Sequence, residues 1–286
     1  MIKNCVSSYS FGYYNNESQL GVLGVVEKAA QMGIDAMEFT ESEYTSLEKA
    51  PELRAKCEEV GITPVAFCVG ASFSTGDSAK LKDEIKRVQG LCDVAKAMGV
   101  SMLRHDIAYG PIECGRPTSY ERSIPQLAAA VTEVTKYAEQ LGIRTMTENH
   151  GFFSQDALRV EKLVCAVDHP NFGALVDIGN FMCADEDPVR SVGIMAPYAF
   201  HVHCKDFYFR SGMEIDPGEG WLTTRGGNKL RGCTLGFGNA KAAQSIGILK
   251  RSGYDGYMSV EYEGGEDALW GIRVSLDNLK RFIEMG

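Results

Sequence analysis

The sequence repeats one short phrase: the end of an amphipathic helix, a glycine, one or two further residues, and then an apolar run of strand length. The phrase occurs five times, in QMGIDAMEF, EVGITPVAF, AMGVSMLRH, QLGIRTMTE and RSGYDGYMSV. Glycine is the residue that most often ends a helix, because it adopts the left-handed conformation readily. Strands that alternate with helices are joined by crossover connections, which produce a parallel sheet. The repeat therefore predicts an α/β fold.

The number of repeating units favours a closed barrel over an open sheet. Eight apolar runs, nearly all followed directly by helical periodicity, lie at residues 6–11, 36–39, 63–69, 101–105, 144–148, 173–177, 199–204 and 257–262. The length of 286 residues is normal for a (β/α)8 barrel, which needs about 250. A doubly wound sheet is the alternative, but no glycine-rich dinucleotide fingerprint follows the first run. We expect a single (β/α)8 TIM barrel domain over residues 1–286.

One segment interrupts the rhythm of the repeat. Residues 207–240 are rich in glycine and polar side chains, and they separate the seventh expected strand from a helix expected at 240–251. A loop of this length in a compact domain is usually functional or disordered. Because it leaves the carboxyl end of a barrel strand, where barrel active sites form, we expect a loop or hairpin that covers the active site. A decorative insertion is the alternative.

Net charge limits the classes of binding partner, and cysteine usage indicates the cellular compartment. The net charge is −9 and no concentrated basic cluster offsets it, so nucleic acid and anionic membrane surfaces are unfavourable partners. The opening MIKNCVSSYSFG lacks the pattern of a signal peptide, and no apolar run approaches the roughly 18 residues of a membrane span. None of the nine cysteines forms a CxxC pair. These features predict a cytoplasmic protein with reduced, mostly buried cysteines.

Four consecutive expected strands each end in a side chain that can bind a metal ion. These side chains are Glu148, Asp177, His203 and Glu261. Inward-pointing residues at the carboxyl ends of neighbouring barrel strands converge at one face. Any single acid could instead cap a helix or pair with an arginine, but four in register are hard to explain in that way. Three carboxylates and one imidazole suit Mn²⁺, the expected cofactor, or Mg²⁺, and can accept Co²⁺ or Zn²⁺.

The sequence blocks around these residues resemble those of a known family. TENHG, VDIGN, HVHCKD and SVEYEG are similar to the signature blocks of the xylose-isomerase-like sugar isomerase/epimerase barrels, which include ketose 3-epimerases, hydroxypyruvate isomerase and the inositol-catabolism dehydratase. SYSFG and GIDAMEF also fit, so the resemblance spans most of the chain. It implies that the four residues bind the metal and that Glu148 and Glu261 are also the catalytic acid and base. Relatives often carry histidine where this chain has Asn180, so Asn180 is expected only to hydrogen-bond the substrate.

The ligand set suits proton transfer next to a carbonyl group. A metal ion that chelates a carbonyl oxygen and an adjacent hydroxyl would stabilise the enediolate formed when the α-proton leaves. Two carboxylates on opposite faces of a sugar could remove a proton and return one from the other side. We therefore expect an isomerase or epimerase of a keto-sugar or related polyol. A lyase or dehydratase acting on a keto-sugar or keto-inositol stays open, as does a non-catalytic sugar-binding barrel.

A nuclease of the same barrel type is a poor fit. Such an enzyme needs several metal ions and many histidine ligands, whereas this chain has five histidines and an acidic net charge. The expected partner is a small-molecule sugar, and the absence of a phosphate-cradling motif favours an unphosphorylated one. The sequence is compatible with a homo-oligomer.

Five residues are expected to contact substrate: His150, Asn180, Lys205, Arg210 and Trp221. Lys205 or Arg210 could hold a substrate oxygen, although a surface charge or a salt bridge is an equal alternative. His150 could equally donate a hydrogen bond at a helix entry.

Aromatic and acidic residues near other strand ends are weaker candidates for a role in the active site. Phe11, Phe39 and Trp221 could wall the pocket, although core packing is the commoner role for such residues. Glu38 and Glu41, near the end of the second expected strand, are weaker acid candidates.

Overall fold

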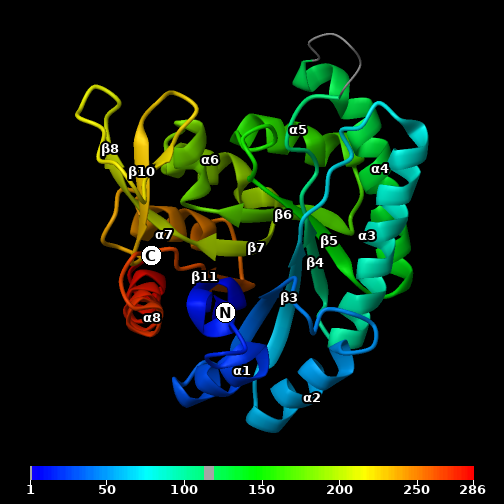
Figure 1. Cartoon of the computed structure of the whole chain (residues 1–286). Coiled ribbons are helices and arrows are strands. Elements are labelled where there is room, and N and C mark those ends of the chain that lie inside the picture. The colour runs from blue at the N-terminus through cyan, green and yellow to red at the C-terminus, as the bar shows by residue number, and fades with distance from the viewer. Residues whose placement is uncertain (1, 113–118) are drawn as a thin grey trace.

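Eight parallel strands close into a barrel in the computed structural model, which describes residues 2–112 and 119–286 (Figure 1). The strands are β1 (Lys3–Ser7), β2 (Ala36–Thr40), β3 (Thr63–Val69), β4 (Met102–His105), β5 (Arg144–Glu148), β6 (Phe172–Asp177), β7 (Ala199–Cys204) and β11 (Tyr257–Val260). Each pairs with its neighbours along the chain, and β11 closes the ring by pairing with β1. The predicted (β/α)8 barrel is confirmed.

Helices surround the barrel on its outer face (Figure 1). They are α1 (Gly21–Gln31), α2 (Ala50–Val60), α3 (Ser78–Met98), α4 (Tyr120–Gln140), α5 (Ala157–Val167), α6 (Pro188–Met195), α7 (Ala242–Arg251) and α8 (Ala268–Met285). Gly61 and Gly99 end α2 and α3 with φ of 79°, the left-handed conformation that the repeated phrase predicts. Among the described helices, none has the length and apolarity needed to cross a membrane.

The first strand lies earlier in the chain than expected. It ends at Ser7, and a 3₁₀ segment, η1 (Ser8–Asn15), follows where the apolar run at 6–11 had predicted strand. The hydroxyl of Ser10 holds this segment in place, because it donates to the carbonyl of Val260 at 3.1 Å and accepts from the amide of Tyr262 at 2.8 Å. These bonds tie η1, which follows β1, to the end of the neighbouring strand β11.

The barrel interior changes in character from one end to the other. Towards the amino ends of the strands it is filled by small, aliphatic and sulfur-containing side chains, including Cys5, Ala66, Met146 and Leu175. A larger apolar core lies between the strands and the helices. Each of the eight cysteines in the described part of the chain is free, and seven of these are buried, whereas Cys114 lies outside the described residues. Because the interior is apolar towards the amino ends of the strands, polar side chains that could carry out chemistry are expected at the carboxyl ends.

The segment at 207–240 contains a small sheet rather than a simple loop. β8 (Asp206–Arg210), β9 (Leu222–Thr223) and β10 (Lys229–Cys233) pair antiparallel in the order β8–β10–β9, outside the barrel (Figure 1). Asp185, after β6, accepts hydrogen bonds from Thr224 and Asn228 in this segment. None of residues 207–240 lines the cavity over the predicted ligands, so the expected covering of the site is not seen.

One buried carboxylate anchors this insertion to the barrel. Asp206 accepts four backbone N–H groups, from Phe207, Gly236, Gly238 and Ala240, at 2.8 to 3.0 Å. Burial nevertheless raises the pKa of Asp206, because desolvation outweighs these bonds. The side chain therefore fixes both ends of the segment at one point.

The substitution Asp206→Ala is expected to loosen the insertion while leaving the barrel closed. Hydrogen bonds to charged groups contribute about 1.5–3 kcal/mol each, and four amides, two of them in buried hydrogen bonds, would lose their acceptor, so we expect at least about 3 kcal/mol of lost stability. Hydrogen exchange of the amides of residues 236–240 measures this directly. The exposed Asp216→Ala should change stability by less than about 0.5 kcal/mol. Unchanged protection at 236–240 in Asp206→Ala would contradict the anchoring role.

Candidate metal centre

The structure brings the four predicted ligands together at the carboxyl ends of the strands. One ligand atom from each of Glu148, Asp177, His203 and Glu261 lies within 4.8 Å of the others. Glu148 and Asp177 are the last residues of β5 and β6, and Glu261 directly follows β11. His203 in β7 pairs with Asp177 in the strand register. The convergence follows from parallel strands that end at one face of the barrel.

The donor atoms of this cluster fit a divalent ion. His203 Nδ1 lies 3.3 Å from Glu261 Oε2 and 3.8 Å from the nearest oxygens of both Glu148 and Asp177. His203 Nδ1 and Asp177 Oδ2 are buried and make no hydrogen bond to a described residue, although Glu261 and Lys205 respectively lie within ion-pair distance of them. Buried polar atoms without partners are costly, and most have an explanation. Three carboxylates and one imidazole nitrogen match the mostly oxygen coordination of Mn²⁺ or Mg²⁺ and also tolerate Zn²⁺.

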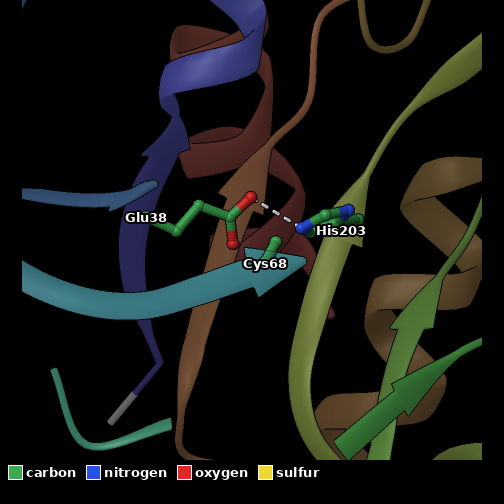
Figure 2. A group of neighbouring side chains, drawn as sticks. All are labelled: Glu38, Cys68 and His203. Carbon is green, nitrogen blue, oxygen red and sulfur yellow. Dashed lines mark ion pairs between the residues drawn. The ribbon is translucent and has the colours of Figure 1, made fainter. Parts of the chain in front are cut away.

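The opposite side of the His203 ring is held by Glu38 of β2 (Figure 2). His203 Nε2 lies 2.7 Å from Glu38 Oε1, and His201 Nε2 lies 2.6 Å from Glu38 Oε2. All three side chains are almost completely buried. Burial alone would raise the pKa of Glu38, but the two histidines hold it well below its ordinary value. Glu38, a weaker acid candidate in the sequence, thus orients His203 so that Nδ1 faces the other ligands.

Cys68 of β3 lies beside Glu38 and His203 and forms a second group of metal-binding type with them (Figure 2). Burial, with a contribution from the Glu38 charge, raises the pKa of the Cys68 thiol to about 12. Metals bind the thiolate form, which a raised pKa disfavours. In addition, Glu38 Oε1 and His203 Nε2 already contact each other at 2.7 Å. The four-residue cluster is therefore the better candidate centre.

Glu148 is held in place through both of its oxygens. Arg104 Nη2, from β4, lies 2.8 Å from Glu148 Oε2 and also 2.8 Å from Asp106 Oδ1. Asn180 Nδ2 donates to Glu148 Oε1 at 2.8 Å. Burial raises the pKa of Glu148 even though Arg104 opposes the shift. Arg104 is not among the site residues predicted from the sequence, since its only local signal is a basic residue near the end of a short strand, MLRH.

Lys205 is a buried cation among the carboxylates of the cluster. Its Nζ lies 2.6 Å from Glu261 Oε2, 3.1 Å from Glu263 Oε1 and 3.4 Å from Asp177 Oδ2. Burial would lower the pKa of Lys205, but these carboxylates hold it well above the ordinary value. The ammonium group therefore stays charged, and it holds Glu261 much as Arg104 holds Glu148.

A cavity of about 440 Å³ opens over the cluster, and some of the residues predicted to contact substrate line it. His150 and Lys205 line it, and His150 Nδ1 lies 3.1 Å from Asp106. Asn180 is buried against Glu148. Arg210 and Trp221 are not brought to the cavity: Arg210 is exposed and pairs with Glu214 at 3.0 Å.

The other weaker candidates divide between core and cavity. Phe11 and Phe39 are buried in the apolar core, which agrees with the alternative given for them. Glu41 lines the cavity and accepts the amide of Gly70 at 3.1 Å, so it is an acid at the mouth rather than a ligand of the cluster.

Comparison with known proteins places the fold and the sequence in one family. Residues 26–282 match the xylose isomerase-like TIM barrel family. The 3-oxo-isoapionate decarboxylase of Pectobacterium atrosepticum is 25% identical over 239 residues, which cover 82% of this chain and 75% of that protein.

Solved structures of similar fold include two with known bound groups. D-psicose 3-epimerase of Clostridium cellulolyticum with D-tagatose has a TM-score of 0.75 and 18% identity, covering 98% of this chain and 99% of that one. The IolI protein with bound zinc has a TM-score of 0.75 and 17% identity, covering 99% and 98%. The resemblance seen in the sequence is confirmed, and the chain belongs to the xylose isomerase-like TIM barrel family.

Proposed function

We propose that this chain is a divalent-metal-dependent isomerase or epimerase that moves a proton next to the carbonyl group of a keto-sugar or related polyol. Glu148, Asp177, His203 and Glu261 would hold the ion, with Mn²⁺ as the expected metal and Mg²⁺, Co²⁺ or Zn²⁺ as alternatives. The observation that carries the proposal is the convergence of three carboxylates on a buried imidazole nitrogen that makes no hydrogen bond, beneath an open cavity.

The two glutamates are suited to proton transfer because they reach the site from different sides. Glu148 ends β5 and Glu261 follows β11, with β6 and β7 between those strands in the barrel. A bound ion would polarise the substrate carbonyl and stabilise negative charge as the adjacent carbon is deprotonated. A proton taken by one glutamate and supplied by the other inverts a carbon centre, whereas return to the neighbouring carbon exchanges aldose and ketose. Arg104 and Lys205 hold the two carboxylates in position.

A lyase is the second candidate. Its support is the 25% identity to a protein named as a decarboxylase. Loss of CO₂ from the carbon next to a carbonyl leaves negative charge on that carbon, and loss of a β-hydroxyl begins with removal of the proton from the same carbon, so the same residues could serve both reactions. A dehydratase acting on a keto-sugar or keto-inositol belongs to this class, and a non-catalytic sugar-binding barrel is a minor third candidate.

Deuterium exchange separates these candidates. The protein with Mn²⁺ is incubated in D₂O with unphosphorylated ketopentoses and ketohexoses, and each sugar is examined by NMR. We expect deuterium at one carbon next to the carbonyl of at least one sugar, with an epimeric or isomeric product. If no sugar exchanges a carbon-bound proton, the isomerase and epimerase proposals both fail. A dehydrated product in place of an isomeric one would support the lyase.

A further inference from the structure

A second, larger groove adjoins the metal cavity. Its volume is about 1,040 Å³, against about 440 Å³ for the cavity. The two share the lining residues Tyr9, Thr40, Glu41 and Glu263, so they form one depression at the barrel mouth. The segments that follow β1, β2 and β11 wall the groove. Sites for small molecules usually measure about 300–1,000 Å³, so the cavity alone already suffices for a monosaccharide.

The charges along the groove disfavour an anion. The described residues that line it include no lysine, arginine or histidine. Its ionisable lining consists of five carboxylates, Glu41, Glu43, Glu263, Glu266 and Asp267, and of tyrosines. A phosphate or carboxylate placed there would meet charges of its own sign in a concave space that concentrates their field. The groove therefore suits an uncharged group.

Exposed aromatic rings give the groove a further property. Tyr9 and Tyr13 line it with 51% and 63% of their surface exposed, so part of each ring stays open to a ligand. Tyr14 packs edge-on against Tyr13 at 5.8 Å, and its hydroxyl donates to Asp267 at 2.8 Å, which braces the pair. An open ring face accepts the C–H surface of a sugar, while carboxylates, serines and asparagines accept its hydroxyl protons.

We propose that the groove binds a second, uncharged sugar unit joined to the keto-sugar that reacts, so that the substrate is a keto-disaccharide or similar glycoside. The inference rests on the proposed function for the reacting end. The unit in the groove does not react, and its binding energy serves to hold the carbonyl over Glu148 and Glu261. A phosphorylated monosaccharide is disfavoured by the same geometry.

The test uses four probes with the whole 286-residue chain loaded with Mn²⁺: D-fructose, D-fructose 6-phosphate, and the glucosyl-fructoses turanose and isomaltulose. Calorimetry measures affinity, and solvent deuterium exchange measures turnover. We expect at least one disaccharide to bind about tenfold or more tightly than fructose, equal to about 1.4 kcal/mol, and the phosphate to bind most weakly. Equal affinities, or tightest binding of the phosphate, would overturn the proposal.

Variants locate the effect in the groove. Tyr13→Ala should reduce the ratio of disaccharide affinity to fructose affinity, here called the disaccharide advantage, to about twofold without changing the affinity for fructose. Tyr13→Phe should keep the full disaccharide advantage because the ring face remains. Phe209→Ala removes an exposed ring outside the groove and should change neither affinity. Glu43→Lys should strengthen binding of the phosphate. An unchanged disaccharide advantage in Tyr13→Ala, or a changed oligomeric state in place of changed affinity, would contradict sugar binding.

The outcomes distinguish this inference from the proposed function. Tighter binding of a disaccharide than of fructose, without exchange of any carbon-bound proton, would support sugar binding in the groove and overturn the isomerase or epimerase proposal. Deuterium exchange into fructose, without tighter binding of either disaccharide, would support the proposed enzyme and overturn sugar binding in the groove.

Discussion

Replacing Glu261 with glutamine is expected to slow exchange of the substrate's α-proton by about 1,000-fold or more. Glutamine keeps the shape of the side chain and one carbonyl oxygen, but it cannot carry the transferred proton. General acid or base groups contribute about 10²–10⁴-fold. Lys205, whose Nζ lies 2.6 Å from Glu261, also loses its nearest carboxylate, so its charge is less well compensated. Glu148→Gln should have an effect of similar size, since the two residues act as a pair.

The measurement is the rate of deuterium incorporation at saturating Mn²⁺, with the bound metal counted in the same samples by electron paramagnetic resonance. Glu58→Gln, an exposed glutamate on α2, is the matched control and should keep the full rate. If Glu261→Gln binds metal and exchanges within a few-fold of the unmodified protein, Glu261 is not a proton carrier. If it exchanges slowly only because metal is lost, its role is that of a ligand alone.

The second large effect is expected from Glu38→Ala, at a residue outside the four-residue cluster. The change leaves His201 and His203 without their shared partner in a fully buried position. Breaking a buried ion pair typically costs about 3–5 kcal/mol. Loss of the group that orients a ligating histidine typically weakens metal binding about 10–100-fold. We therefore expect losses in both stability and metal affinity.

A milder variant separates the two losses. Glu38→Gln keeps an oxygen that can accept from one of the histidines, so it should be more stable than Glu38→Ala while still binding Mn²⁺ more weakly than the unmodified protein. Urea unfolding of the metal-free protein and Mn²⁺ titration give the two quantities. The exposed Glu58→Ala should alter stability by less than about 0.5 kcal/mol. A Mn²⁺ affinity within twofold of normal in both Glu38 variants would refute the orienting role.

The convergence of Glu148, Asp177, His203 and Glu261 could be predicted because its signal is local. Each follows a short apolar run, and parallel strands carry their last residues to one face, so the position in the strand almost determines the position in space. The glycines that close helices before strands, such as Gly61 and Gly99, could be recognised for the same reason. Strand period and helix ends are properties of a few neighbouring residues.

The supporting residues depend on contacts between distant parts of the chain. Glu38 and His201 are 163 residues apart and meet only because the barrel closes. Arg104 reaches Glu148 across the β4–β5 pair, and nothing in MLRH indicates that partner. Arg210 and Trp221 failed to reach the cavity because the insertion folds as a sheet anchored by Asp206. Its glycine-rich, polar sequence has too weak a period to reveal those strands.

The central claim is that Glu148, Asp177, His203 and Glu261 hold one divalent ion, and anomalous diffraction from crystals grown with Mn²⁺ tests it most directly. The predicted result is a single manganese peak per chain, within bonding distance of His203 Nδ1 and of an oxygen from each of the three carboxylates. A peak between Glu38, Cys68 and His203 Nε2, or no peak among the four residues, would contradict the account.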